Sequence, residues 1–368
     1  MAGTYLITGG AGFIGRYLCE DLLARGYHVR VLDALIDQVH GSGAPPLPDA
    51  VEFFHGDIRD AALIDAALTN VDGVFHLAAE VGVGQSMYEI GRYVGANDLG
   101  TAVLLERLIA RPVKRLVVAS SMSVYGEGLY RTADGTDDGG VRRVLKEGST
   151  QWDPVDENGA PLIPIPTDET KPVDLASVYA VTKFVQERNS LIVSRAYGME
   201  AVALRLFNVF GPGQALSNPY TGVLANFGAR LLNGQRPLVF EDGRQKRDFV
   251  HVRDVARAFR LAMERPAAAG HVINVGSGRS YTIGRIAEML AKAMEVPELA
   301  PHLLGKARAG DIRHCFADIS KARALLGFAP EHPLEDSIHE SAAWIRSSDA
   351  PDRGEHARSQ LEARGLMA

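Results

Sequence analysis

The sequence contains very little cysteine and no long hydrophobic run. Its 368 residues include only two cysteines, Cys19 and Cys315, which excludes a disulfide framework and a cysteine-based metal site and fits a reducing compartment. No apolar run approaches the roughly 18 residues that a membrane-spanning helix needs. The first predicted strand begins by about Tyr5, which leaves no room for a signal peptide. We therefore expect a cytoplasmic globular protein.

An excess of positive charge is also missing. The chain carries 39 basic and 45 acidic residues, a formal net charge of −6, and a pI near 6.0. This balance argues against a nucleic acid or an anionic membrane surface as the main partner, although local arginines can still bind an anionic small molecule. The length is sufficient for a sizeable core and two domains.

Short apolar runs alternate with helical patterns along the first half of the chain. The runs that predict strands are residues 5–8, 29–32, 51–54, 73–77 and 115–119, with further strands expected at 202–206 and 272–275. A helix over about 12–25 follows the first run. This alternation predicts an α/β fold with a Rossmann-type, doubly wound parallel sheet.

A glycine-rich turn follows the first predicted strand. Residues 8–15 read TGGAGFIG, so Gly9, Gly12 and Gly15 recur every three residues where a helix begins. Glycines at this spacing allow a tight turn, close approach of a pyrophosphate and packing of the helix on the strand. The helix N-terminus then faces the phosphate charge. The pattern alone also occurs in plain turns, so its context decides the interpretation.

Asp33 supplies that context at the end of the second predicted strand. It lies about 20 residues beyond the turn, where a carboxylate can accept hydrogen bonds from both hydroxyls of an adenosine ribose. Ala34 and Leu35 follow, so no basic side chain is ready for a 2′-phosphate, which Asp33 would repel. The sequence therefore favours NAD over NADP, against the alternative of a helix cap or turn carboxylate.

Two further strand ends are predicted to contact the cofactor. Asp57 and Ile58 follow the third strand and could flank the adenine, while Leu77, Ala78 and Ala79 follow the fourth. Small residues at the fourth strand end would let a cofactor lie against it. Each segment, taken alone, is also typical of an ordinary turn.

Tyr179 and Lys183 are four residues apart and therefore share one helix face. A free tyrosine, with a pKa near 10, is a poor base at pH 7, but a neighbouring ammonium and an oxidised nicotinamide both favour the phenolate. Ser121, just past a predicted strand end, can hydrogen-bond a substrate oxygen and relay its proton to Tyr179. The spacing also arises by chance on amphipathic surface helices; its position after the glycine turn, Asp33 and Ser121 favours catalysis.

Taken together, the motifs resemble the extended short-chain dehydrogenase/reductase family, specifically its nucleotide-sugar epimerases and dehydratases. The resemblance covers nearly the whole chain and is carried by residues 8–15, 76–79, 120–126, 179–183, 205–208, 247–252 and 308–311. It implies that Ser121, Tyr179 and Lys183 are the catalytic residues. It also implies NAD as cofactor and a homodimer formed through the helices that carry Tyr179 and Asn97.

The resemblance implies two sets of binding residues and no metal site. The cofactor set is Gly9, Gly12, Phe13, Ile14, Gly15, Asp33, Asp57, Ile58, Leu77, Ala78, Ala79, Asn97, Tyr179, Lys183 and Phe207. The substrate set is Val83, Ser121, Ser123, Tyr179, Asn208, Phe240, Arg247, Arg308, Asp311 and Cys315.

Within these sets, individual roles also follow from the resemblance. Asn208, Arg247 and Arg308 would hold a diphosphate, which suits arginine forks, although each arginine could instead form a surface salt bridge. Asp311 would bind a ribose hydroxyl and Phe240 the nucleobase. The position of Cys315 would influence how large a sugar fits, and Asn97 would support the active-site helix or the nicotinamide side.

The residues after Ser121 distinguish among the reactions of the family. Relatives that eliminate water carry Asp-Glu there, and decarboxylating relatives keep a Glu at the second position, whereas this chain has Met122 and Ser123. The resemblance therefore implies NAD-dependent inversion at C4 of a nucleotide-diphosphate sugar (dTDP- or UDP-linked), dTDP-L-rhamnose-like or a UDP-hexose. A 4-keto-sugar reductase and a non-catalytic NAD-binding protein are the alternatives.

The expected organisation has two domains, an insertion and a tail. Residues 1–207 form the NAD-binding Rossmann domain, to which 245–275 return; residues 208–348 are mainly substrate-binding, and 349–368 form a polar, frayed tail. Residues 127–170 form an insertion that contains six glycines, four prolines, 10 acidic residues and 4 basic residues. We expect it to be either a lid or subunit contact, or a surface excursion. Many relatives carry cysteine pairs in this insertion, near Thr132 and residues 156–158; their absence rules out a metal-stapled loop.

Overall fold

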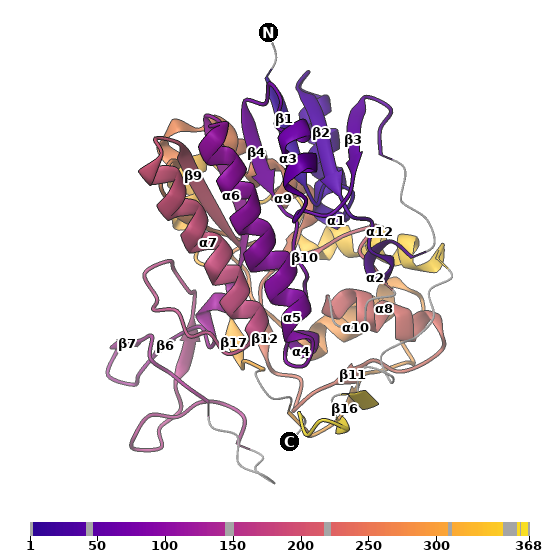
Figure 1. Cartoon of the computed structure of the whole chain (residues 1–368). Coiled ribbons are helices and arrows are strands. Elements are labelled where there is room, and N and C mark those ends of the chain that lie inside the picture. The colour runs from indigo at the N-terminus through magenta and orange to yellow at the C-terminus, as the bar shows by residue number, and fades with distance from the viewer. Residues whose placement is uncertain are drawn as a thin grey trace.

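A central sheet of seven parallel strands organises the molecule (Figure 1). The computed structural model describes residues 3–41, 47–143, 151–216, 222–307, 311–348, 359–360 and 362–366. In spatial order the strands are β14 (Val272–Val275), β9 (Glu200–Leu206), β5 (Arg115–Ser121), β4 (Gly73–His76), β1 (Thr4–Thr8), β2 (His28–Asp33) and β3 (Val51–His55). This order confirms the predicted doubly wound sheet, whose connections change direction between β1 and β4, the place where such sheets bind ligands.

The central strands are apolar on both sides because helices cover both faces of the sheet. Leu6 and Ile7, neighbours on β1, are both fully buried but belong to different hydrophobic clusters. Successive side chains of a strand point to opposite faces, so each joins the helices on its own side. A continuous apolar run in the sequence therefore becomes a strand between two cores.

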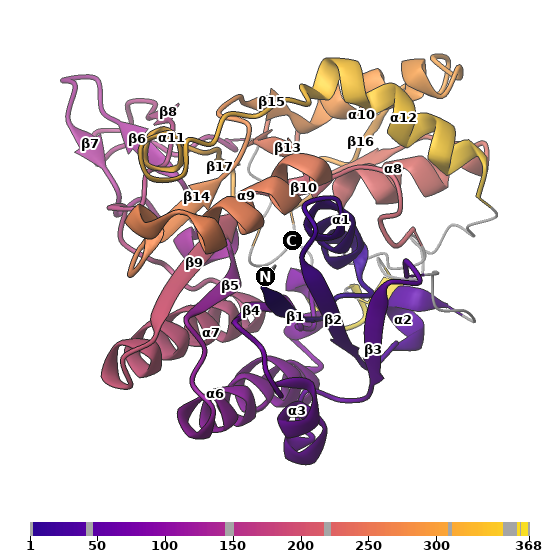
Figure 2. The ribbon, with the colours of Figure 1, turned by 90° about the horizontal axis from the view of Figure 1, so that it is seen from above.

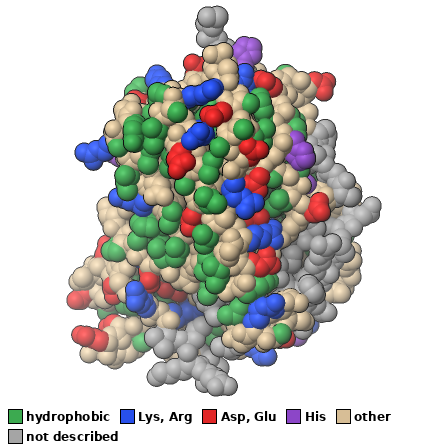
Figure 3. Space-filling model, viewed as in Figure 1, with side chains coloured by type: hydrophobic (Ala, Val, Ile, Leu, Met, Phe, Trp, Pro, Cys, Tyr) green, Lys and Arg blue, Asp and Glu red, His purple; other side chains and the backbone are tan. Residues whose placement is uncertain are grey.

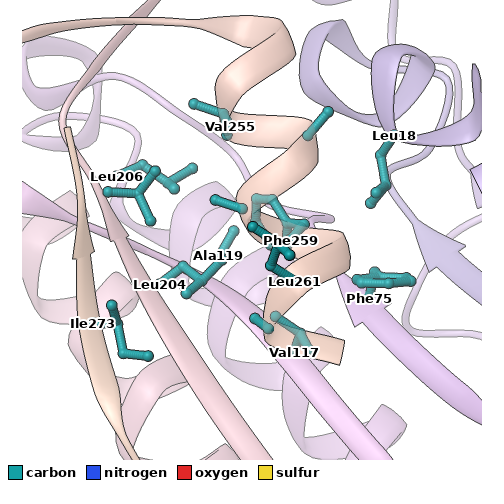
Figure 4. Close-up of a cluster of buried hydrophobic side chains, with 14 of the residues drawn as sticks. Leu18, Phe75, Val117, Ala119, Leu204, Leu206, Val255, Phe259, Leu261 and Ile273 are labelled. Atoms are coloured by element: carbon teal, nitrogen blue, oxygen red, sulfur yellow. The ribbon is translucent and has the colours of Figure 1, made fainter. Parts of the chain in front are cut away.

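Helices cover both faces of the sheet (Figure 2). The helices of one face are α1 (Phe13–Leu23), α9 (Val252–Glu264) and α11 (Ser320–Leu326), and those of the other are α3 (Ala61–Ala67), α6 (Gly100–Ala110) and α7 (Val178–Ala196). Figure 4 shows Phe259 of α9 and Leu18 of α1 above Phe75 and Val117 of the strands. The chain thus comes back to the sheet at α9 and β14, while the expected domain boundaries stay a prediction.

A second hydrophobic cluster lies beyond the carboxyl ends of the strands. It is built by α8 (Val223–Leu232), α10 (Ile283–Ala293) and α12 (Leu334–Arg346), with Phe227, Leu290 and Ile338 buried among them. Short strand pairs surround it: β10 (Asn208–Phe210) with β13 (Phe249–His251), β11 (Leu238–Val239) with β16 (His302–Leu303), and β12 (Lys246–Arg247) between β15 (Tyr281–Thr282) and β17 (His314–Cys315). These elements cover the edge of the sheet where the predicted site residues converge.

The acidic insertion forms a small antiparallel sheet of its own. Its strands are β6 (Leu129–Arg131), β7 (Asp137–Asp138) and β8 (Ile163–Ile165), packed through the buried Tyr130, Val141 and Leu162. Figure 1 shows them at the lower left, beside β17 and β12. Residues 144–150 of the insertion lie outside the described part.

Short helical elements complete the described fold. They are α2 (Asp37–His40), α4 (Val83–Ser86), α5 (Ile90–Tyr93), the π-helical turn η1 (Val94–Leu99), and the 3-10 turns η2 (Met122–Tyr125) and η3 (Pro266–Ala268). Among the described residues, none of the helices combines the length and apolarity that crossing a bilayer requires. The same part of the chain contains no group of three His, Cys, Asp or Glu side chains that could hold a metal ion.

Candidate active site

One cavity of about 750 Å³ extends from the carboxyl ends of the strands to α8. Nearly all of the predicted site residues line it: Gly9, Gly12, Phe13, Ile14, Gly15, Asp33, Asp57, Ile58, Leu77, Ala78, Ala79, Val83, Ser121, Ser123, Tyr179, Lys183, Phe207, Asn208, Phe240, Arg247 and Asp311. Asn97 and Cys315 are not among the lining residues, and Arg308 lies outside the described residues. The predicted cofactor and substrate residues therefore meet in a single space.

The glycine turn forms a cradle at the start of α1. Gly9 has a φ of 71°, and a Cβ atom there would lie only 2.7 Å from the backbone nitrogen of Ala78. A Cβ at Gly15 would lie 2.5 Å from the Cα of Gly10. Residues larger than glycine would therefore separate helix, turn and strand. Because the first turn of α1 borders the cavity, its backbone N–H groups suit a phosphate.

Asp33 is fixed at the end of β2 by two backbone donors. Its Oδ2 accepts a hydrogen bond from the Ala11 nitrogen at 3.0 Å, and its Oδ1 accepts one from the Leu35 nitrogen at 2.9 Å. The same Oδ1 is 3.6 Å from Nε2 of His40, a cavity residue that the sequence analysis missed. A carboxylate held in this way can accept further bonds from ribose hydroxyls, and it would repel a 2′-phosphate.

Tyr179 lies in the first turn of α7, next to Ser121 at the end of β5. The helix begins there because the Ser177 hydroxyl accepts a hydrogen bond from the Ala180 nitrogen at 3.1 Å, as an N-cap residue does. Burial raises the pKa of Tyr179 to about 12, and its hydrogen bond with Ser121 acts in the opposite direction. The phenol is thus protonated at neutral pH unless positive charge is brought close to it.

Lys183 borders the cavity one helical turn after Tyr179. Its Nζ donates a hydrogen bond of 2.7 Å to Oε1 of Gln186. Burial lowers the pKa of Lys183 to about 7, while the charge of Glu187 partly offsets this effect. An amine of this kind can hold or release a proton near neutral pH.

Arg247 and Asn208 border the cavity on the side of the second cluster. The Arg247 guanidinium donates to the carbonyl oxygens of Ile312, Arg313 and Lys246 at 2.6, 2.9 and 2.9 Å. Within the described residues no carboxylate forms an ion pair with it, so its positive charge can serve an anion. In the same part of the chain, Oδ1 of Asn208 is buried without a hydrogen-bond partner.

The carbonyl oxygens that hold Arg247 belong to a segment that is itself held by ion pairs. Arg313 is fully buried and pairs with Asp153, Glu241 and Asp242 at 2.7, 2.7 and 2.6 Å. Arg143 pairs with Glu241 at 2.6 Å and donates to the carbonyl oxygen of Asp311 at 3.0 Å. Since Arg143 and Asp153 come from the insertion, this cluster ties the insertion to the wall of the cavity.

Comparison with known proteins places the chain in a family. The family described as "NAD dependent epimerase/dehydratase family" matches residues 5–276. The chain belongs to this family. It is therefore an NAD-dependent enzyme, which confirms the predicted cofactor and the resemblance stated above.

Individual members of the family are similar to the chain over nearly its whole length. It is 38% identical over 348 residues to a dTDP-L-rhamnose 4-epimerase of Burkholderia thailandensis, covering 92% of this chain and 94% of that protein. It is 32% identical over 359 residues to a UDP-glucose 4-epimerase of Halalkalibacterium halodurans, covering 92% and 94%. A solved structure of UDP-glucose 4-epimerase from Thermus thermophilus, in complex with NAD, gives a TM-score of 0.74 at 30% identity, covering 94% of this chain and 99% of that one.

In this family member the side chain of Asn97 bridges two elements rather than bordering the cavity. Its Oδ1 accepts from the Glu80 nitrogen at 2.7 Å, and its Nδ2 donates to the Glu80 carbonyl oxygen and to Oγ1 of Thr182 at 2.9 Å. The amide thus joins the segment after β4 to α7. Its predicted contact with the cofactor, like that of Cys315 with the sugar, stays a prediction; Cys315 is buried and 3.9 Å from Oγ1 of Thr167.

Several polar residues of the cavity were missed by the sequence analysis. Besides His40 they include Arg92, Arg230 and Gln245, and the apolar Leu366 reaches the cavity from the tail. One sequence signal was available: Gln245 stands two residues before Arg247, so the two share a face of an extended segment. No comparable signal marks Leu366, because only the fold brings the tail to this edge.

Proposed function

We propose that this enzyme inverts the configuration at C4 of a nucleotide-diphosphate sugar, either dTDP-L-rhamnose-like or a UDP-hexose. The observation that supports this proposal most directly is that Ser121, Tyr179, Lys183 and Arg247 line the same cavity. One sugar can then reach the catalytic residues while its diphosphate stays at the far wall. Met122 stands beside Ser121, where a dehydratase would need a carboxyl group, so oxidation and re-reduction remain.

The proposed reaction begins with removal of the proton from the C4 hydroxyl. Tyr179 takes this proton as phenolate, with Ser121 hydrogen-bonded to the same substrate oxygen as a relay. When bound, NAD takes up hydride from C4 and gives it back. The 4-keto sugar turns about its diphosphate linkage, which Arg247 holds, and Tyr179 returns the proton once the opposite face is presented. The reaction has no net oxidation or reduction.

The charges of the site support this role for Tyr179. Its pKa of about 12 in the protein alone is too high for a base at neutral pH. A protonated Lys183 and the positive charge of an oxidised nicotinamide both favour the phenolate. An oxidised cofactor would therefore favour the base, so that proton removal and hydride removal would go together.

The cavity residues also support the assignment of a nucleotide sugar. Arg247, with which no carboxylate pairs in the described part of the chain, and the first turn of α1 provide two separate sites for phosphate groups, one for the substrate and one for the cofactor. Two buried polar atoms, Oδ1 of Asn208 and Oγ of Ser123, have no hydrogen-bond partner among the described residues. They can therefore accept or donate hydrogen bonds to a sugar or a phosphate. Similarity to 4-epimerases acting on dTDP- and UDP-linked sugars points the same way.

A test of the proposal uses the purified protein without added cofactor. Proton NMR would follow UDP-glucose, UDP-N-acetylglucosamine and dTDP-L-rhamnose in separate samples. Inversion at C4 in any of them supports a self-contained epimerase and identifies its sugar class. If all three sugars persist until NADH and a 4-keto sugar are supplied, the enzyme is a reductase; if nothing reacts while NAD is bound, a non-catalytic role replaces both.

We also propose that the enzyme is a cytoplasmic homodimer. Apolar side chains on α5, η1 and α7 stay exposed, among them Ile90, Leu99, Val181 and Ile192 at 51, 53, 41 and 56%. Figure 3 shows hydrophobic side chains gathered on this face of the molecule. A second copy of the chain would cover them. Both thiols are free and buried, which supports a reducing location.

A further inference from the structure

Lys183 contacts a residue that the proposed mechanism does not use. Gln186 is fully buried, and its Oε1 accepts the hydrogen bond of 2.7 Å from the Lys183 ammonium. The two side chains are three residues apart on α7, so they lie on the same face of that helix. Lys183 borders the cavity, whereas Gln186 lies behind it. Gln186 therefore holds the amine from the side away from the ligands.

The orientation of the Gln186 amide is fixed by its other contacts. Its Nε2 lies 3.3 Å from the carbonyl oxygen of Ala78, a group that can only accept, and 2.9 Å from Oγ1 of Thr101. The nitrogen must therefore face these groups, which leaves Oε1 directed at Lys183. An amide turned the other way would set two donors against each other and two acceptors against each other.

His76 extends this arrangement to the sheet. Its Nε2 is 2.8 Å from Oγ1 of Thr101, and its Nδ1 is 2.7 Å from Oγ1 of Thr8. Burial lowers the pKa of His76 to about 3, so the ring is neutral, with one donor and one acceptor. Nε2 of Gln186, a donor, also lies 3.1 Å from Nε2 of His76, so we assign this ring nitrogen as the acceptor. Thr101 then donates to Nε2, and Nδ1–H donates to Thr8.

The bonds run in one direction from the amine to the sheet. Lys183 donates to Gln186, Gln186 to Thr101, Thr101 to His76, and His76 to Thr8, and all of these side chains are buried. The residues come from α7, α6, β4 and β1, so the chain of bonds spans the place where the sheet changes direction. Each member can make its bond only if the next one is correctly oriented.

We infer that Gln186 is a positioning residue for the reaction: its carbonyl oxygen, oriented by Thr101, His76 and Thr8, holds the Lys183 ammonium at the cavity wall. This inference rests on the proposed function of Lys183. A free lysine loses side-chain entropy when it is ordered. Gln186 has already ordered it, so the amine is in place before substrate arrives.

The test follows the titration of Lys183 in the protein labelled with ¹³C at the lysine ε-carbons. Among the described residues, the charged and titratable groups that interact with the amine are His76 on β4 and Glu187 on its own helix, and Tyr179 lies one helical turn before it. Among the eight lysine signals, the one lost in Lys183→Met is assigned to Lys183. Gln186→Met, which removes the acceptor at similar length, should lower the midpoint of this titration by about one to two pH units. Gln186→Glu should raise it.

Turnover gives a second readout that a purely structural role would not move. Gln186→Met should lower kcat by about tenfold or more, with KM within about twofold, because the substrate contacts are unchanged. The pH at which kcat of this variant falls on the alkaline side should decrease together with the midpoint of the Lys183 titration. Ser190→Ala, buried on the same helix without contact to Lys183, serves as the control and should leave the midpoint and kcat as in the original protein.

Failure of this inference can be told apart from failure of the proposed function. The titration needs neither substrate nor turnover, so it can succeed even if no nucleotide sugar is epimerised. An unchanged Lys183 midpoint in both Gln186 variants, in an enzyme that epimerises its sugar, would overturn the positioning role alone. If Gln186→Met does not fold, Gln186→Glu still decides, since its carboxylate keeps an acceptor toward Lys183 and adds a negative charge beside it, while it loses the Nε2 donor to Ala78 and Thr101.

Discussion

Tyr179 is the residue on which the proposed chemistry depends most. Tyr179→Phe removes only the hydroxyl, so the fold should persist while kcat falls by about 10²–10⁴-fold, the usual contribution of a general acid–base group. The rate of C4 inversion measured by NMR checks this expectation. Tyr197→Phe is the matched control, because Tyr197 ends the same helix and is exposed. A Tyr179→Phe enzyme within tenfold of the original would contradict the assignment.

Much of the site could be predicted at the scale of single residues because the residues follow strand ends or share a helix turn. Asp33 at the end of β2 and Ser121 at the end of β5 reach one edge since parallel strands end on the same side. Gln186 could have been found too, three positions after Lys183 on the predicted helix. Its role depends on Thr101 and His76, however, and contacts between segments far apart in the sequence cannot be predicted from local residue spacing.

His76 makes stability depend on pH. Burial lowers its pKa to about 3, against about 6.5 in an unfolded chain. Between these values the unfolded state binds a proton that the native state does not, so stability falls as the pH decreases through this window. In His76→Gln the free energy of unfolding should decrease less steeply as the pH falls, by about 1.4 kcal/mol per pH unit.

Urea unfolding of both proteins between pH 7 and about pH 4 measures this difference. Asp248, whose pKa burial raises to about 6, acts in the opposite direction but is common to both. Equal pH slopes in the two proteins would show that His76 is protonated in the native state.

At the scale of elements, the insertion differs most from what the sequence predicts. Its glycines, prolines and acidic residues indicate an excursion, yet Tyr130 and Leu162 are buried in a small sheet. Strands of two or three residues leave no measurable periodicity, which is why they could not be predicted. The ion pairs of Arg143 and Arg313 were equally hidden, because each joins segments about 70 residues or more apart.

Arg313→Met tests the coupling between the insertion and the cavity wall. The change leaves Glu241 buried without one of its two arginine partners, and breaking a buried pair from one side costs about 3–5 kcal/mol. Affinity for UDP should also decrease, because the segment that holds Arg247 loses its support. Urea unfolding and calorimetric titration with UDP measure the two effects.

Arg131→Met is the matched control within the insertion. Arg131 pairs with Asp137, and both side chains are about half exposed, so the loss of stability should be far smaller than in Arg313→Met. UDP affinity should be unchanged. Equal losses of stability in the two variants would mean that the Arg313 cluster is no more than a surface feature.

At the scale of the whole molecule, the exposed apolar face predicts association. Leu99→Glu combined with Val181→Glu places charge where a second copy would bury it, so the particle should fall from twice the chain mass of 39.6 kDa to that mass. Light scattering coupled to size exclusion measures the change. Phe53→Glu, on the edge strand β3 and 40% exposed, is the control. A monomeric original protein would disprove the proposed dimer.

In the proposed reaction, hydride leaves and returns to the same carbon within one cavity. The most direct measurement supplies the enzyme with a nucleotide sugar carrying deuterium at C4 and follows the product by NMR and mass spectrometry. We expect an inverted sugar that keeps its deuterium at C4, with none appearing in free NADH. Loss of the label to solvent, or its appearance in released NADH, would contradict the proposed reaction.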